Sequence, residues 1–190
     1  MSEETPVLPD APPAVLPDAP PAVLPDAPEV VPDAAAAGEQ PQAVAAAQAA
    51  FEDLDVDAPL VGILMGSKSD LPVMEAAEKE LNDRGIRSEV RVMSAHREPD
   101  RVAEYARNAK LRGLRVVIAG AGLSAALPGV VAAHCELPVI GVPLTSRTSV
   151  AGGLDALLSI AQMPPGVPVA CVGVDNARNA AVLAARILSA

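Results

Sequence analysis

The pattern of hydrophobic and polar positions changes at residue 59, where short apolar runs begin to alternate with amphipathic stretches. Residues 61–65, 115–120 and 138–142 are almost continuously apolar, which is typical of strands buried on both faces of a parallel sheet. Residues 86–92 alternate apolar and charged side chains, as a strand with one less buried face would, and residues 167–174 form a fifth predicted strand. Helical periodicity fills the intervals, and the predicted helices span residues 71–84, 99–111, 123–133, 153–161 and 176–188.

This alternation predicts the fold class of the second part of the chain. Five strand–helix units in residues 59–190 favour an α/β three-layer sandwich, with a five-stranded parallel sheet in flavodoxin-like order. The length fits one domain with an independent core. Tyr105 is the only aromatic residue in this part, so we expect a core of aliphatic and small side chains.

Residues 1–58 have a different composition and are predicted to form a disordered tail. Residues 7–14 recur identically at 15–22 and in altered form at 23–30, and 11 of the 20 prolines precede residue 42. Proline lacks the backbone donor that helices and sheets need, so disorder or polyproline-II-like extension is expected. A PxxP ligand for an aromatic groove is the alternative, although no basic residue flanks the repeat to orient it.

Charge and cysteine content exclude several classes of function. Residues 1–58 contain 12 of the 24 acidic residues and none of the 14 basic ones, so the net charge of −10 belongs to the tail. The domain lacks the basic footprint of a nucleic-acid-binding protein.

Two isolated cysteines, Cys135 and Cys171, form neither a disulfide framework nor a metal cluster. Residues 116–135 are uncharged, but glycine and proline interrupt them, so we expect no membrane-spanning helix there. No signal peptide is visible at the start, and we expect a cytoplasmic protein.

Three segments at strand ends carry the candidate chemistry, because open α/β sheets bind ligands beyond the carboxyl ends of their strands. The first is Gly-Ser-Lys-Ser-Asp at residues 66–70. A glycine turn that leads into a helix N-terminus favours a phosphate, the hydroxyls of Ser67 and Ser69 add donors, and Asp70 can accept from sugar hydroxyls. Alternatively, Ser69 or Asp70 only caps the helix, with Pro72 in its first turn; the two roles are compatible.

The second segment, Ser94-Ala95-His96-Arg97, follows the second strand. Imidazole both takes and gives a proton near neutral pH, and a guanidinium pairs with phosphate or carboxylate at two points. A lone histidine is often structural, but a position at a strand end beside Arg97 favours a functional role. His134 lies at a predicted helix end, and we predict no catalytic role for it.

The third segment, residues 120–129, is rich in small side chains. Small residues allow a ligand to lie against the backbone, although close packing between helix and strand explains them equally well.

Together, these segments strongly resemble the N5-carboxyaminoimidazole ribonucleotide mutase family of purine biosynthesis. The likeness covers residues 60–189, and joint occurrence at these spacings is far more specific than any single piece. The matching stretches are MGSKSD at 65–70, SAHR at 94–97, AGAG with ALPGVVA within 119–132, LPVIGVP at 137–143, GGLDALLSIAQMPPGVPVA at 152–170 and ARNAAVLAARIL at 177–188.

The resemblance implies an enzyme that moves a carboxylate from an exocyclic nitrogen to a ring carbon of an aminoimidazole ribonucleotide, with no metal and no organic cofactor. By the family pattern, CO2 is released and recaptured in a closed site, where His96 handles the proton. The family is octameric, and the QMPPGVP segment resembles one that reaches a neighbouring subunit's site. The implied substrate-binding residues are Ser67, Ser69, Asp70, Ser94, Ala95, Arg97, Gly122 and Leu127.

The sequence departs from the family pattern at two positions. Many members have a second histidine where this chain has Ala126, and Glu98 replaces a common threonine. A related branch that carboxylates aminoimidazole ribonucleotide directly with CO2 typically has lysine after the catalytic histidine, so Arg97 favours the mutase. The alternatives are that direct carboxylase, a non-catalytic flavodoxin-like module that binds nucleotide or flavin, and a scaffold role for the tail.

Overall fold

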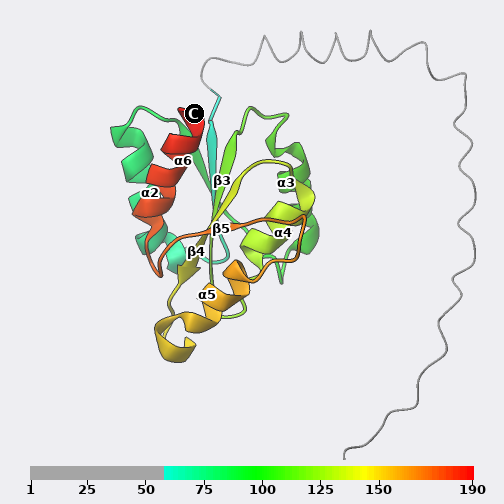
Figure 1. Ribbon diagram of the computed structural model, residues 1–190, viewed down its shortest axis with the longest axis vertical. Helices are drawn as coiled ribbons and strands as arrows, with labels where there is room; N and C mark the ends of the chain where they lie inside the picture. The colour runs from blue at the N-terminus through cyan, green and yellow to red at the C-terminus, as the bar shows by residue number, and fades with distance from the viewer. Residues whose placement is uncertain (1–57) are drawn as a thin grey trace, which may run out of the picture. The chain divides into compact units, whose positions relative to one another are not determined.

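A five-stranded parallel sheet lies at the centre of residues 58–190, the part of the chain that the computed structural model describes (Figure 1). Its spatial order, β2-β1-β3-β4-β5, confirms the predicted flavodoxin-like arrangement. Apart from Ala58, the expected tail lies outside the described residues. The strands are β1 (Val61–Met65), β2 (Ser88–Val92), β3 (Val116–Gly122), β4 (Val139–Leu144) and β5 (Ala170–Cys171).

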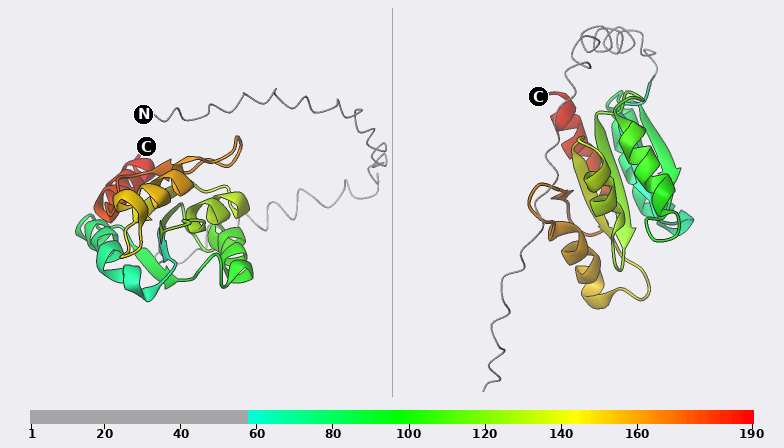
Figure 2. Two further views of the ribbon diagram at one scale, coloured as in Figure 1. Left: turned by 90° about the horizontal axis from the view of Figure 1, so that it is seen from below. Right: turned by 90° about the vertical axis from the view of Figure 1, so that its right-hand side faces the viewer.

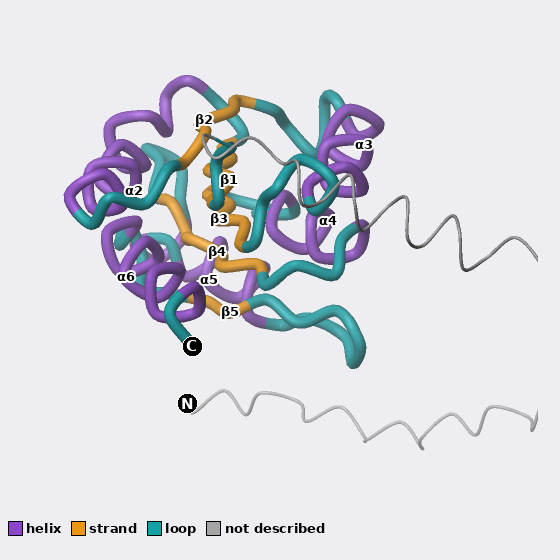
Figure 3. The backbone as a smooth tube through the Cα atoms, turned by 90° about the horizontal axis from the view of Figure 1, so that it is seen from above, coloured by secondary structure: helices purple, strands orange, loops and turns teal. Residues whose placement is uncertain are grey.

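Helices cover both faces of the sheet, as a view from above shows (Figure 3). One face carries α2 (Leu71–Asp83) and α6 (Ala177–Leu188), which pack side by side. The other face carries α3 (Pro99–Ala109), α4 (Leu127–His134) and α5 (Leu154–Ala161).

The two cores follow from the alternation of side chains along the strands. Ile63 belongs to the core under α2 and α6, whereas its neighbour Leu64 belongs to the core under α3 and α4. On α6, Ala180 and Ala184 are fully buried, so this helix approaches the sheet through small side chains. The expected core of aliphatic and small residues is confirmed, with Tyr105 as its aromatic member.

The fifth strand is much shorter than predicted. Its ladder with β4 is limited to the pairs Ile140–Ala170 and Gly141–Cys171. Before it, the N–H of Val167 donates to the carbonyl of Pro164 over 3.2 Å and forms a turn, and Pro168 has no N–H for a ladder. After it, Asn176 donates to Gly173 over 3.1 Å and turns the chain toward α6. The prediction of residues 167–174 was therefore wrong in extent, because apolar content does not reveal these turns.

Two further boundaries differ for local backbone reasons. The helix predicted at 123–133 begins only at Leu127, because Leu123 has a φ of 57° and lies outside the helical region. The strand predicted at 86–92 begins at Ser88, because Ile86 donates to the carbonyl of Leu81 over 2.9 Å and closes the end of α2. Gly85, at a φ of 69°, makes that helix end possible.

A polar network braces β2 against α3. The side chain of Glu89 accepts a 2.7 Å hydrogen bond from the hydroxyl of Tyr105 and an ion-paired hydrogen bond from Arg112. The Arg112 guanidinium also lies over the Tyr105 ring, 5.0 Å from its centroid. Gly62 pairs with Glu89 in the sheet, and a Cβ at position 62 would collide with the Tyr105 hydroxyl. The buried Tyr105 side chain therefore requires a glycine here.

The residues that the structure describes include no helix long and apolar enough to cross a membrane. Within residues 58–190 there is also no group of three or more histidine, cysteine, aspartate or glutamate side chains that could hold a metal ion.

Candidate functional site

A pocket of about 390 Å³ lies at the carboxyl ends of β1, β2, β3 and β4. Figure 2 includes a view from below, toward the loops at this end of the sheet. The register brings the loops together, because Met65 pairs with Val92 on one side and with Gly120 on the other. All nine residues predicted for the site line this pocket: Ser67, Ser69, Asp70, Ser94, Ala95, His96, Arg97, Gly122 and Leu127. Their roles stay predictions, whereas their juxtaposition is a finding.

The first predicted segment folds into one 3-10 turn, Lys68–Asp70, before α2 begins. Ser67 caps this turn: its Oγ accepts from the N–H of Ser69 over 3.2 Å, and Asp70 Oδ2 accepts from the N–H of Ser67 over 3.1 Å. The hydroxyl of Ser69 lies within hydrogen-bond distance of both Ser67 Oγ, at 2.8 Å, and Asp70 Oδ1, at 3.2 Å. The predicted cap by Ser69 or Asp70 is not the one observed: Ser67 caps the 3-10 turn, and Asp70, at the N-cap position of α2, makes no side-chain hydrogen bond to that helix.

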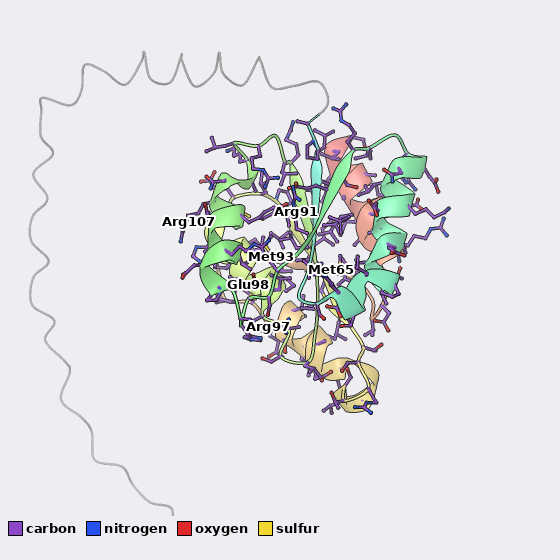
Figure 4. The ribbon with its side chains drawn as sticks, turned by 180° about the vertical axis from the view of Figure 1, so that it is seen from behind. Met65, Arg91, Met93, Arg97, Glu98 and Arg107 are labelled. Atoms are coloured by element: carbon purple, nitrogen blue, oxygen red, sulfur yellow. The ribbon has the colours of Figure 1, made fainter. Side chains whose placement is uncertain are left out.

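The second segment is tied to the first. Arg97 donates from Nη2 to the carbonyl of Gly66 over 2.7 Å, and Met93 donates its N–H to the carbonyl of Met65 over 2.9 Å. Figure 4 shows Arg97 at the lower end of the sheet, below Met65 and Met93, with Arg107 farther up on α3. Because a guanidinium carries five N–H donors, Arg97 retains others for an anionic ligand.

Glu98, which takes the place of the family's threonine, stabilises the turn that carries the histidine. Its backbone N–H donates to the carbonyl of Ser94 over 2.8 Å, and its carboxylate accepts from Arg101 over 2.8 Å and from the N–H of Ser94 over 3.4 Å. The hydrogen bond from Arg101 and that from Ser94 hold the pKa of Glu98 below its usual value, so the group stays an acceptor. Ser94 itself is buried, with 8% of its surface exposed.

His96 lines the pocket from this turn with an exposed side chain. No hydrogen bond joins its ring to another residue within 58–190, so both ring nitrogens are available to a ligand. The second histidine, His134, lies at the end of α4 and lines a different hollow on the surface. His96 is thus the histidine at the strand ends, and its catalytic role stays a prediction.

The third segment forms the apolar wall. Leu127 is 2% exposed at the start of α4, and Ala126 occupies the position of the second histidine found in many family members. Gly122 allows the backbone of Leu144 to approach β3 closely, since a Cβ at position 122 would lie 2.8 Å from the carbonyl oxygen of Leu144. Leu123 also lines the pocket and remains 43% exposed.

A fourth segment, Leu144–Thr145–Ser146, completes the pocket and was missed by the sequence analysis. It follows β4, so the rule that placed the other three segments also applies to it. Its small polar residues resemble an ordinary loop, and no single side chain in it suggests catalysis. Strand position was the signal that could have found it.

The four segments combine two chemistries in one pocket. Hydroxyls and a guanidinium offer hydrogen bonds and positive charge to a phosphate or carboxylate. Alanine and leucine side chains form an apolar wall beside the exposed imidazole of His96. This combination suits a phosphorylated substrate that reacts by proton transfer at a partly dry centre.

A family model described as AIR carboxylase matches residues 60–190. A protein of Pyrococcus abyssi named N5-carboxyaminoimidazole ribonucleotide mutase is 60% identical over 134 residues, which cover 70% of this chain and 76% of that protein. The protein of the same name from Thermotoga maritima is 59% identical over 130 residues, covering 68% of this chain and 75% of that protein.

A solved structure is also similar to this fold. The crystal structure of Treponema denticola PurE superposes with a TM-score of 0.61 at 37% sequence identity, and the match covers 69% of this chain and 80% of that one. This structural match covers about the same share of the chain as the matches to the two mutase relatives.

Proposed function

The chain belongs to the AIR carboxylase family, and on that premise we propose that it is a mutase acting in de novo purine biosynthesis. It converts N5-carboxyaminoimidazole ribonucleotide to 4-carboxy-5-aminoimidazole ribonucleotide. The observation that carries the proposal is the meeting of His96 and Arg97 with a serine-lined turn and an apolar wall in one pocket.

His96 carries one proton through the reaction. When the N–C bond breaks, CO2 leaves, the bonding electron pair stays on the nitrogen, and His96 as imidazolium gives that nitrogen a proton. The ring carbon then attacks the trapped CO2 and forms the new C–C bond. Neutral His96 removes the proton that this carbon still carries. The histidine returns to its starting state, and no external reactant is consumed.

The other pocket residues hold the substrate. Ser67, Ser69 and Arg97 supply donors to the phosphate, and Asp70 accepts from the ribose hydroxyls. Ala95, Gly122 and Leu127 form the apolar side on which CO2 is retained, since a site without water keeps CO2 from hydration and escape. The proposed steps use no metal ion.

The competing function in the same family is carboxylation of aminoimidazole ribonucleotide by free CO2. The names of the Pyrococcus and Thermotoga relatives, which are matched over three quarters of their length, and the arginine at position 97 favour the mutase. Parallel assays decide between them: we expect turnover of the N-carboxylated substrate, and little turnover of aminoimidazole ribonucleotide with bicarbonate. The opposite preference would establish the carboxylase, and turnover of neither would leave a non-catalytic nucleotide-binding module.

We also propose that the protein assembles as a homo-octamer, as its resemblance to the family implies. Supporting this, Leu154 and Leu158 are 44% and 46% exposed, and their spacing of four places them on one side of α5; Val150, which precedes this helix, is 65% exposed. The neighbouring segment between α5 and β5, drawn in orange, extends away from the sheet (Figure 2). Sedimentation equilibrium measures the mass directly, and a monomer at assay concentration would contradict the assembly.

Residues 59–190 are proposed to contain the whole activity, with residues 1–58 as a passive extension. Deletion of residues 1–58 is expected to leave turnover and assembly unchanged. A loss of either would assign the tail a scaffold role. We place the reaction in the cytoplasm, because a phosphorylated substrate does not cross membranes unaided.

A further inference from the structure

The pocket wall after β4 is held by a residue from a distant part of the chain. Asp175 lies between β5 and α6, and its carboxylate accepts two hydrogen bonds from Thr145. The Thr145 N–H donates to Oδ1 over 2.8 Å, and the Thr145 hydroxyl donates to Oδ2 over 2.5 Å. Thr145 lines the pocket, whereas Asp175 is not among the described residues that do so.

Asp175 compensates for the shortness of β5. The ladder between β4 and β5 ends early, and beyond it Val172 donates to the carbonyl of Gly141 over 3.1 Å and Asp175 to that of Pro143 over 2.8 Å. The carboxylate then accepts the N–H of Thr145, which no strand neighbour reaches. Asp175 does this at a φ of 54°, a left-handed conformation that aspartate and asparagine tolerate better than most residues.

The opposite side of the same wall is fixed by Gly122. This glycine pairs with Leu144, and a Cβ at position 122 would lie 2.8 Å from the carbonyl oxygen of Leu144. Leu144 and Thr145 therefore lie between β3, which approaches closely on one side, and a carboxylate that accepts two hydrogen bonds on the other. A polar residue fixed on both sides presents one defined hydrogen-bonding group to the pocket.

We propose that Asp175 is a positioning residue that makes Thr145 a hydrogen-bond acceptor for the ribonucleotide. The Thr145 hydroxyl proton is committed to the carboxylate, so its oxygen can offer only lone pairs to a ligand. Thr145 then accepts from an N–H or O–H of the substrate, such as the ring amine or a ribose hydroxyl, and does not bind its phosphate or carboxylate. This ligand assignment rests on the proposed mutase function.

Three variants separate positioning from folding. Asp175→Asn retains the size and the tolerance for a left-handed backbone, but its amide nitrogen donates where the carboxylate accepted, which reverses the Thr145 hydroxyl. Thr145→Val removes the hydroxyl and retains the shape. Asp83→Asn is the matched control, because Asp83 is an exposed carboxylate at the end of α2 that pairs with Lys79 over 3.2 Å.

Steady-state kinetics of the full chain test the ligand assignment. We expect Asp175→Asn and Thr145→Val each to raise KM about 10-fold, the effect of one lost hydrogen bond, with kcat changed less than about twofold. The double variant should be no worse than either single variant, since both remove the same interaction. Unchanged KM in Asp175→Asn, or additive effects in the double variant, would overturn the proposal.

Hydrogen exchange tests the positioning without any reaction. In Asp175→Gly, which tolerates the same φ but has no acceptor, the Thr145 amide should exchange faster than in the wild type. Unchanged exchange would refute the positioning role whatever the enzyme catalyses. A wild-type enzyme without mutase turnover would instead overturn the proposed function and the ligand assignment, and the exchange result would still decide the positioning.

Discussion

The carboxylate of Asp70 accepts the backbone N–H of Ser67 over 3.1 Å, and so closes the turn that opens the candidate site. Its other oxygen lies 3.2 Å from the hydroxyl of Ser69. One side chain thus orders both serines that we expect to bind the substrate. Asp70 therefore stabilises a turn that is also a wall of the pocket.

Replacing Asp70 by alanine should weaken substrate binding by at least about 10-fold, because two hydrogen bonds that shape the site are lost. Asp70→Asn is the matched variant: its amide oxygen can still accept from Ser67, so the loss should be smaller. Calorimetric titration with the product ribonucleotide measures both. An unchanged dissociation constant in Asp70→Ala would limit Asp70 to a structural role in the 3-10 turn.

Replacing His96 by asparagine should lower turnover by at least about 100-fold, the low end for a lost acid–base group. Folding and ligand binding should be retained, because His96 is exposed and makes no hydrogen bond within residues 58–190. His134→Asn is the control, since this exposed histidine lies outside the site and should leave turnover unchanged. Near-normal turnover in His96→Asn would refute the assignment.

Leu123 holds a left-handed conformation, with φ at 57°, at the mouth of the pocket. This conformation costs about 1–2 kcal/mol in a residue with a Cβ, whereas glycine adopts it freely. We therefore predict that Leu123→Gly is about 1 kcal/mol more stable than Leu123→Ala, because both lose the leucine side chain and only one retains the strain. Urea unfolding compares the two, and an alanine variant of equal or greater stability would show that no strain is stored there.

The acid limit of stability should depend on Glu89. Burial raises the pKa of this carboxyl, but hydrogen bonds from Tyr105 and Arg112 outweigh that effect, and the pKa lies below its usual value. A lowered folded-state pKa contributes stability above the unfolded value of about 4.3, and this contribution is lost as the pH falls through the folded value. The difference in unfolding free energy between wild type and Glu89→Gln should therefore be largest near neutral pH and should shrink below about pH 4. Urea midpoints across this range measure it, and a difference independent of pH would exclude the linkage.

The accuracy of the predicted strands and helices depended on the kind of sequence pattern. Buried runs such as residues 61–65 predicted strands well, because parallel strands covered on both faces leave no position for polar side chains. Residues 167–174 are also mostly apolar, but the strand predicted there was too long, because turns on either side confine the ladder to Ala170 and Cys171. The left-handed backbone of Leu123 is likewise invisible to periodicity.

The features of the candidate site also differ in how well the sequence predicted them. Three segments could be placed together because parallel strands end at one edge, and their residue types suggested phosphate binding and proton transfer. The same rule also applies to Thr145, which follows β4, but its contact with Asp175, 30 residues away in sequence, could not be predicted. Contacts of this length depend on the three-dimensional path of the chain, and no local pattern encodes them.

In the proposed reaction, one carboxylate leaves nitrogen and is recaptured on carbon within a single site. NMR analysis of the product formed from substrate with a ¹³C-labelled N-carboxylate, in unlabelled bicarbonate, tests it most directly. We predict that the label is retained and appears on the ring carbon, and that His96→Asn abolishes this transfer. A product that carries unlabelled carboxylate from the medium would show that CO2 enters from solution and would contradict the account.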